Sequence, residues 1–210
     1  TIANACKDKN VLFTNVSNII DGSMTYSWDF GNGNSSLSEN PNTIYLSEGS
    51  YQVTLTATSN FGCTSNTNKA VEVYPSPNTN FVVANECVDN SMSFINTSAI
   101  TYGNMTYIWD FNNGNTTNSV NALQSYVSDG FKTIQLIATS NFGCIDTIEK
   151  IAEVYPLPDL SFSNSIATCG TSYLLDAGNS GSTYQWSNGS ISQTTNASYD
   201  GSFAVTVTTP

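Results

Sequence analysis

A ten-residue stretch, Met24–Gly33, dominates this sequence because it occurs more than once. It reads MTYSWDFGNG, returns as MTYIWDFNNG at 105–114, which is 81 positions later, and has a shortened echo, TYQWSNG, at 183–189. Each copy alternates large apolar with polar residues and then stops at an Asn/Gly cluster, which is typical of a half-buried strand that enters a tight turn. The stretch therefore predicts a repeated β-module.

Each copy carries one tryptophan, and tryptophan is the largest apolar side chain that a small core can bury. Trp28, Trp109 and Trp186 are therefore expected at the centres of separate cores. The other alternating runs and turn residues show no helical period and indicate about seven short strands per full repeat. The predicted fold is all-β, a tandem array of immunoglobulin-like antiparallel sandwiches at 1–76, 77–157 and 158–210, the last one shorter and C-terminally incomplete.

The charge balance excludes several classes of partner. Sixteen acidic residues against five lysines, with no arginine and no histidine, give a net charge of −11. Attraction to a nucleic-acid backbone or to an anionic membrane is not expected of such a chain. No apolar run reaches the length of a membrane-spanning helix, so direct membrane insertion is not expected either.

The cysteines follow the same period as the tryptophans. Cys6 and Cys63 are 57 residues apart, and Cys87 and Cys144 repeat that spacing 81 positions later. One pair per repeat at a fixed phase predicts a disulfide inside each repeat, Cys6–Cys63 and Cys87–Cys144, and an oxidising, extracellular location. Each bond would stabilise its repeat by about 4 kcal/mol. A zinc site would need clustered cysteines, and a catalytic thiol would need a histidine, which this sequence lacks.

Cys169 is the fifth cysteine, and it has no partner in the sequence. Aligning 205–210 with 55–60 of the first repeat places the expected partner about three residues past Pro210, by extension of the repeat. We therefore expect this chain to be a window cut from a longer array. Tyr-Pro-x-Pro segments at 74–77 and 155–158 stiffen the junctions, which predicts a semi-rigid rod whose repeats are each other's partners.

The residues of the first repeat resemble a known family. YSWDFGNG at 26–33, followed by GSYQVTLTATSN at 49–60, is similar to the signature of the polycystic-kidney-disease (PKD) domain. That family is an immunoglobulin-like β-sandwich, and the two matching strands carry its core. The resemblance covers residues 1–157 twice. Asn32 and Asn113 stand where the family often has aspartate, so the resemblance does not predict a cation site at that turn.

The cysteine-bearing turns, NFGC at 60–63 and 141–144, carry a second resemblance. Together with the Tyr-Pro-x-Pro linkers they are similar to repeats of large surface proteins that gliding bacteria export through type IX secretion, the SprB-like gliding adhesins. The third unit resembles the immunoglobulin-like repeat that alternates with PKD repeats in such chains. The resemblance implies a non-catalytic, force-bearing stalk of a bacterial cell-surface adhesin, which acts in adhesion and gliding motility and is held at the outer membrane by parts outside this sequence. The alternative is a spacer or a carbohydrate-binding accessory module of a secreted polysaccharide-degrading enzyme or protease.

Candidate residues for chemistry are few. A serine triad needs a histidine, and a glycosidase needs two carboxylates facing a cleft. Asp29 and Asp110 are the best-placed acids, and we expect them to accept backbone N–H bonds of the following turn, so no catalytic residue is assigned. Hard oxygen ligands at Asp8, Glu86 and Asp89 would suit a weak calcium site, without any EF-hand spacing to support it. No other cofactor is expected.

Three aromatic residues have two interpretations. Tyr102, Phe61 and Phe142 could stack on the sugar rings of a polysaccharide or pack against protein. The two phenylalanines recur at the same turn, which favours packing at a domain end or junction. Extracellular surfaces and polysaccharides stay open as partners. Asp146-Thr147-Ile148 resembles the Asp-Thr-aliphatic O-glycosylation motif of the same bacterial group, which would place a glycan on Thr147.

Overall fold

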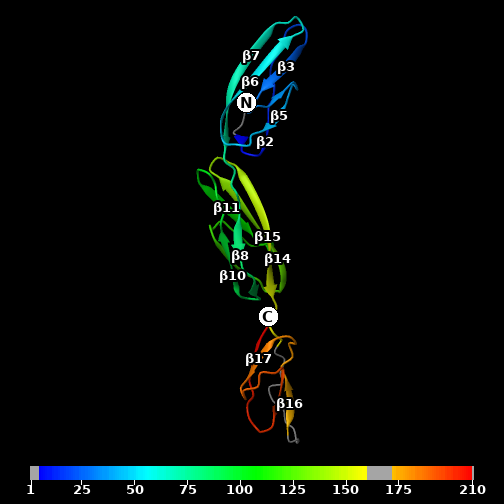
Figure 1. Ribbon diagram of the computed structural model, residues 1–210, viewed down its shortest axis with the longest axis vertical. Coiled ribbons are helices and arrows are strands. Elements are labelled where there is room, and N and C mark those ends of the chain that lie inside the picture. The colour runs from blue at the N-terminus through cyan, green and yellow to red at the C-terminus, as the bar shows by residue number, and fades with distance from the viewer. Residues whose placement is uncertain (1–4, 160–171, 210) are drawn as a thin grey trace. The chain divides into compact units, whose positions relative to one another are not determined.

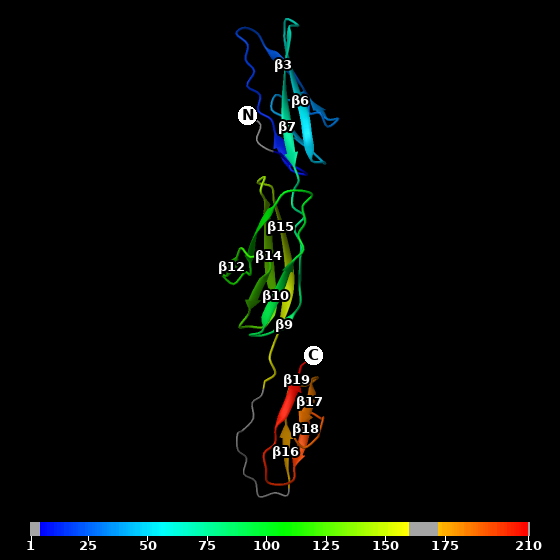
Figure 2. The same cartoon turned by 90° about the vertical axis from the view of Figure 1, so that its left-hand side faces the viewer.

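The computed structural model describes residues 5–159 and 172–209 of the chain, and every regular element in these ranges is a β-strand (Figures 1 and 2). The predicted all-β class with immunoglobulin-like sheets is therefore confirmed. Within these two ranges no apolar helix has the length needed to cross a bilayer. The predicted unpaired residue Cys169 lies outside the described residues.

The chain divides into two compact units. Unit 1 comprises Thr1–Ala84, Met92–Gln124 and Lys132–Ala152, and unit 2 comprises Asn85–Ser91, Ser125–Phe131 and Glu153–Pro210. The division at residues 76 and 157 stays a prediction from the sequence repeat. Residues 5–76 are called the first repeat below, and residues 77–157 the second repeat.

A five-stranded sheet in the order β1-β7-β6-β3-β4 organises the first repeat (Figure 1). Its strands are β1 (Ala5–Cys6), β3 (Met24–Asp29), β4 (Ser35–Ser36), β6 (Gly49–Ser59) and β7 (Thr64–Tyr74). β6 and β7 form a long antiparallel hairpin, and β3 lies antiparallel to β6 with Trp28 opposite Leu55. The short β1 instead runs parallel to the end of β7, with Cys6 opposite Tyr74. This parallel edge strand departs from the purely antiparallel prediction.

The core of the first repeat lies between that sheet and a small antiparallel pair, β2 (Asn10–Leu12) with β5 (Asn42–Ile44). Because neighbouring side chains of a strand point to opposite faces, alternate residues of β3 and β6 reach this core. Phe13 packs between Trp28 and Phe30, with ring centroids 5.6 and 5.1 Å away. Burying one such aromatic side chain contributes roughly 1.5–3 kcal/mol, so this cluster is a main source of stability.

The second repeat reuses the same plan. One sheet has the order β13-β10-β8 and the other the order β12-β11-β14-β15-β9. Trp109 is fully buried, with Phe81 and Phe94 at ring-centroid distances of 5.0 and 5.9 Å. The strands are β8 (Phe81–Val83), β9 (Glu86–Cys87), β10 (Ser91–Asn96), β11 (Met105–Asp110), β12 (Thr116–Thr117), β13 (Ala122–Ser125), β14 (Gly130–Ser140) and β15 (Ile145–Tyr155).

Within residues 172–209, the structure describes four short strands in two antiparallel pairs. β16 (Tyr173–Asp176) pairs with β18 (Thr194–Ala197), and β17 (Thr183–Trp186) pairs with β19 (Val205–Thr208). The buried Trp186 donates its indole N–H to the Ser192 carbonyl at 2.8 Å. All three repeated tryptophans are thus buried, as a core position requires.

Candidate functional site: a disulfide between consecutive repeats

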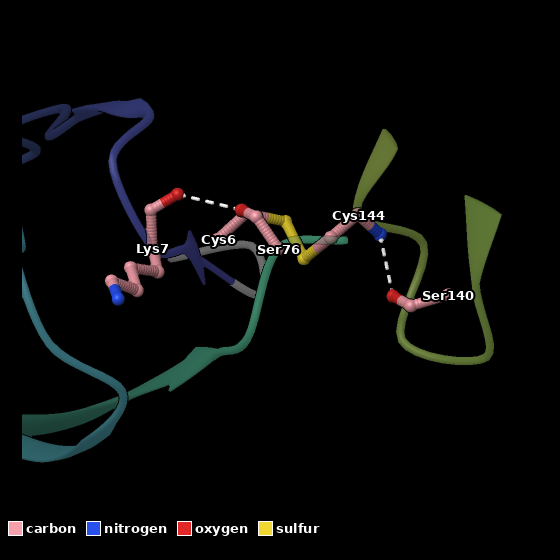
Figure 3. The surroundings of a disulfide bond; sticks show 5 residues. All are labelled: Cys6, Lys7, Ser76, Ser140 and Cys144. Carbon is pink, nitrogen blue, oxygen red and sulfur yellow. Dashed lines mark hydrogen bonds between the residues drawn. A yellow bond between two sulfur atoms is a disulfide. The ribbon is translucent and has the colours of Figure 1, made fainter. Parts of the chain in front are cut away.

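A disulfide joins Cys6 of the first repeat to Cys144 of the second (Figure 3). Their Cα atoms are 5.7 Å apart, and 138 residues separate them along the chain. Cys63 and Cys87 are free thiols. The predicted pairings Cys6–Cys63 and Cys87–Cys144 are therefore wrong, although the same four cysteines are involved.

The length of the β6–β7 hairpin explains the correction. Cys63 directly precedes β7, whereas Cys6 lies beside Tyr74 at the other end of this 11-residue strand. At about 3.3 Å per residue, roughly 35 Å separates the two cysteines. A disulfide needs Cα atoms closer than about 7 Å, so no bond can form inside the repeat. The same holds for Cys144 and Cys87, because Cys87 pairs beside Tyr155 at the far end of β15.

Backbone contacts fix the end of the first repeat that carries Cys6. Lys7 donates its N–H to the Tyr74 carbonyl at 2.8 Å, which continues the parallel pairing of β1 with β7. Ser76, in the linker, donates its hydroxyl to the Lys7 carbonyl at 2.7 Å (Figure 3). The linker is thereby tied to the strand that presents Cys6. Pro75 and Pro77 beside it are buried.

The turn between β14 and β15 presents Cys144. Ser140 donates its N–H to the Cys144 carbonyl, and Cys144 donates its N–H to the Ser140 hydroxyl at 3.1 Å (Figure 3). Gly143 closes this turn with a φ of 85°, a conformation in which a residue without a Cβ atom is favoured. Cys144 is completely buried.

Aromatic stacking accompanies the disulfide. The ring of Tyr74 lies on the ring of Phe142, with centroids 4.5 Å apart and planes 4° from parallel. Tyr102 meets the same phenylalanine edge-on at 5.6 Å. The expectation that Phe142 packs at a junction is confirmed, and Tyr102 contributes to the same cluster. Such pairs are worth about 0.5–1.5 kcal/mol beyond the area they bury.

An asparagine holds the turn in place. Asn141 donates its backbone N–H to the Asn104 carbonyl at 2.9 Å, and its side-chain oxygen accepts the Asn104 N–H at 2.9 Å. Gly103, immediately before, has a φ of 98°, and a Cβ atom there would lie 2.5 Å from that side-chain oxygen. In the motif Asn-Phe-Gly-Cys, the asparagine thus anchors the turn, the phenylalanine stacks on Tyr74, the glycine allows the turn and the cysteine forms the disulfide.

A carboxylate completes the junction. Asp146 accepts the N–H of Thr79 at 2.9 Å, and Thr79 is buried. Asn78 and Ala99 exchange two backbone hydrogen bonds nearby, at 2.8 and 3.0 Å. These bonds lie just after the linker prolines, so they fix the direction in which the chain enters the second repeat.

The acidic candidates have structural partners. Asp29 accepts the Gly31 N–H at 2.9 Å, and Asp110 accepts the Asn112 N–H at 2.8 Å, as expected of turn aspartates. In the described part of the chain, no group of three or more acidic, cysteine or histidine side chains is placed to hold a metal ion. Asp8 and Asp89 instead occupy equivalent tight turns, with φ values of 62° and 66°.

Two further predicted residues are located by the structure. Thr147 is an exposed residue of β15, so its hydroxyl is accessible, and its glycosylation stays a prediction. Phe61, at the turn of the first repeat, is 72% exposed. The sequence placed residues 74–77 at a junction but did not predict the ring stack of Tyr74 or the hydrogen bond of Ser76. The available signal was that Tyr-Pro follows the last strand of both repeats at the 81-residue period.

Comparison with known proteins agrees with this architecture. The family model of the PKD domain matches residues 2–73. The PKD1 domain of Epp from Vibrio anguillarum is 28% identical, and the match covers 39% of this chain and 96% of that domain, with a TM-score of 0.37. The PKD1 domain of the metalloprotease PrtV from Vibrio cholerae is 31% identical, with 38% and 96% covered and a TM-score of 0.35. None of the curated proteins matches this chain. The first repeat of the chain is thus a PKD-type domain.

Proposed function

We propose that this chain is a non-catalytic segment of a large bacterial cell-surface adhesin, in which PKD-type and related repeats form a force-bearing stalk. The proposal extends to export by type IX secretion and to a role in gliding motility. PKD domains are typically extracellular modules, and the disulfide is in keeping with an oxidising compartment.

The Cys6–Cys144 bond is the observation that supports a mechanical role. Tension that enters the chain at Cys6 can leave it at Cys144 through two sulfur atoms. The tension then passes through the disulfide, so the β-hairpins between these two residues carry none of it. A bond inside one repeat would protect that repeat alone, whereas this bond protects the connection between two repeats.

Closure of such a long loop also stabilises the folded state. In the chain-entropy account, a bond across 138 residues contributes about 5 kcal/mol by restricting the unfolded chain. Ion pairs can add little to the stability of this chain, since it has only five lysines and exposed ion pairs contribute at most about 1 kcal/mol each.

The second candidate is an accessory module of a secreted protease. The similarity of the chain to the PKD1 domain of a metalloprotease favours it. The exposed Phe61 at a turn suits stacking on a sugar or a peptide. In this case the same sandwiches would act as a spacer for a catalytic domain elsewhere in the polypeptide.

Surface labelling of the source bacterium separates the two candidates. Antibodies raised against the 210-residue chain should label intact cells, and brief treatment of the cells with an external protease should remove the label. Immunoblots should show a polypeptide far larger than this chain, and deletion of its gene should reduce attachment to surfaces. Recovery of the antigen only from the culture medium, together with proteolytic activity, would overturn the adhesin proposal and favour the second candidate.

A further inference from the structure

The first repeat carries an uncovered copy of the surface that Cys6 occupies on the second repeat. The Cys63 turn repeats the Cys144 turn bond for bond: Ser59 donates to the Cys63 carbonyl at 2.8 Å, and Cys63 donates to the Ser59 hydroxyl at 3.2 Å. The side chain of Asn60 accepts the Ser23 N–H at 3.0 Å, as its counterpart Asn141 does with Asn104. The two turns therefore present their cysteines in the same way.

The Cys63 turn and the Cys144 turn differ in their exposure to solvent. Cys144 is fully buried and Phe142 is half-buried under Tyr74. Cys63 is exposed, and 72% of the surface of Phe61 is accessible. A free thiol beside an exposed aromatic ring, on a turn whose copy is occupied, indicates a binding surface without its partner.

The complementary half of the junction also has a copy. Cys87 pairs in parallel with Tyr155, as Cys6 pairs with Tyr74, and Tyr155 is likewise followed by Pro-x-Pro. Val88 donates its N–H to the Tyr155 carbonyl at 2.9 Å, matching the bond from Lys7 to Tyr74. Each full repeat thus has an acceptor surface, formed by the Asn-Phe-Gly-Cys turn, and a donor end, formed by the first cysteine and the tyrosine before the linker.

We propose that the acceptor surface of the first repeat, Cys63 with Phe61, binds the donor end of another repeat of the same type and forms a disulfide with its cysteine. The partner is a PKD-type repeat that precedes residue 1 in a longer polypeptide and carries a cysteine at the position of Cys6 and a tyrosine at the position of Tyr74. The inference depends only on the repeat geometry and holds whether or not the protein is an adhesin.

A preceding repeat fits this surface better than a small thiol does. At the occupied surface the disulfide is accompanied by a stacked ring and by a linker hydrogen bond to the strand that carries Cys6. Only a folded donor end supplies these groups together. Asp21 stands at the position of Tyr102, so the contact on the first repeat is centred on Phe61 alone.

The bond forms by thiol–disulfide exchange with a small disulfide such as oxidised glutathione. The thiolate of one cysteine attacks the glutathione disulfide, forming a mixed disulfide and releasing one glutathione. The second protein thiolate attacks the cysteine sulfur of the mixed disulfide and releases the second glutathione. The two protein thiols lose two electrons and two protons, and both are recovered in the two reduced glutathione molecules.

An extended chain tests the proposal. Residues 1–81, in which Cys63 is replaced by serine so that Cys63 occurs only once in the extended chain, are added in front of the complete 210-residue chain. This keeps the 81-residue period at the new junction. After equilibration in a glutathione redox buffer, peptide mapping without reduction should find Cys6 of the added repeat joined to Cys63 of the next repeat. Alkylation of Cys63 should fall roughly tenfold or more relative to the 210-residue chain, because tethering holds the thiols at about millimolar effective concentration.

Three variants of the extended chain sharpen the result. Cys87→Ser should leave the new bond unchanged, and Cys63→Ser should leave Cys6 of the added repeat open to alkylation. Phe61→Ala, in the repeat that carries Cys63, should make the new bond easier to reduce. If tethering alone held the bond, this substitution would leave the ease of reduction unchanged. Full alkylation of Cys63, or a bond from the added Cys6 to any cysteine other than Cys63, would overturn the inference. Cell-surface labelling does not depend on this outcome, so failure here is distinguishable from failure of the proposed function.

Discussion

Tyr74 and Phe142 belong to different repeats, yet their rings stack 4.5 Å apart and 4° from parallel. Stacked rings are worth about 0.5–1.5 kcal/mol beyond their buried area, and this pair adjoins the disulfide. The junction is thus held by two independent interactions, one covalent and one not.

Replacement of Phe142 tests the stacking contribution. Phe142→Ala should lower the free energy of unfolding by about 1–2 kcal/mol, because the stack with Tyr74 and the contact with Tyr102 are both lost. Phe61→Ala, at the equivalent but exposed position, is the matched control and should change it by less than about 0.5 kcal/mol. Urea unfolding monitored by circular dichroism provides both values. Equal losses in the two variants would mean that the stack is not what stabilises the turn.

Single-molecule pulling tests the path of the load. With the disulfide intact, the residues between Cys6 and Cys144 cannot extend. Reduction should release them together and add about 480 Å of contour, since an extended residue spans at most about 3.5 Å. Bonds inside each repeat would instead release two lengths of about 200 Å each. Cys63→Ser should behave like the wild-type chain, and Cys144→Ser should show the long extension without any reductant.

Alanine substitutions at Gly103 and Gly114 distinguish a steric clash at the junction from backbone strain. Gly103 and Gly114 have φ values of 98° and 87°, so alanine is similarly strained at either position. Only at Gly103 would the new Cβ atom collide, 2.5 Å from the Asn141 oxygen and 2.7 Å from the Phe142 ring. Gly103→Ala should therefore cost at least about 1 kcal/mol more than Gly114→Ala, within the range of overpacking. Thermal unfolding of both variants measures the difference, and equal losses would show that the loop accommodates the methyl group.

The buried Tyr45 predicts how stability changes at alkaline pH. Burial, together with the nearby Tyr51, raises the pKa of Tyr45 to about 12. The unfolded chain ionises this tyrosine near pH 10, so between about pH 10 and 12 the unfolded state loses a proton that the folded state keeps. Stability from this residue is complete below about pH 10 and is lost as the pH rises through that window.

The variant Tyr45→Phe should flatten this alkaline decline. At pH 7 it should cost about 1 kcal/mol, because the Tyr45 hydroxyl donates a 3.1 Å hydrogen bond to the buried Phe30 carbonyl. Urea unfolding at pH 8, 10 and 11, after alkylation of the free thiols, measures both effects. Tyr173→Phe, at an exposed tyrosine of β16, is the control. An unchanged slope in Tyr45→Phe would assign the decline to other groups.

Local sequence patterns were sufficient for the strands and their cores. The alternation within Met24–Gly33 predicted a strand that ends at a turn, which is β3 (Met24–Asp29), because the period-2 pattern of a half-buried strand depends on neighbouring residues only. The turn roles of Asp29 and Asp110 followed from the preference of aspartate for the N–H two residues later. The first residues of β7, Thr64–Lys69, are polar and exposed and show no apolar alternation, so the pattern does not predict this part of the strand.

The disulfide pairing could not be obtained in the same way. The constant spacing shows that each cysteine occupies the same position in both repeats. It does not show whether a cysteine pairs with the other cysteine of its own repeat or with a cysteine of the next repeat. The pairing depends on which end of an 11-residue hairpin each cysteine occupies. That in turn depends on β1 joining the end of β7 in parallel, a contact between residues almost 70 positions apart.

By itself, then, the sequence determined the module: an all-β PKD-type sandwich around a repeated tryptophan, with cysteines at a fixed phase. These features depend on side-chain alternation and turn chemistry, which act over a few residues. The tertiary structure decided how one module is joined to the next. Because the hairpin holds Cys6 and Cys63 roughly 35 Å apart, the cysteines of one repeat cannot reach each other, and Cys6 instead meets Cys144 of its neighbour.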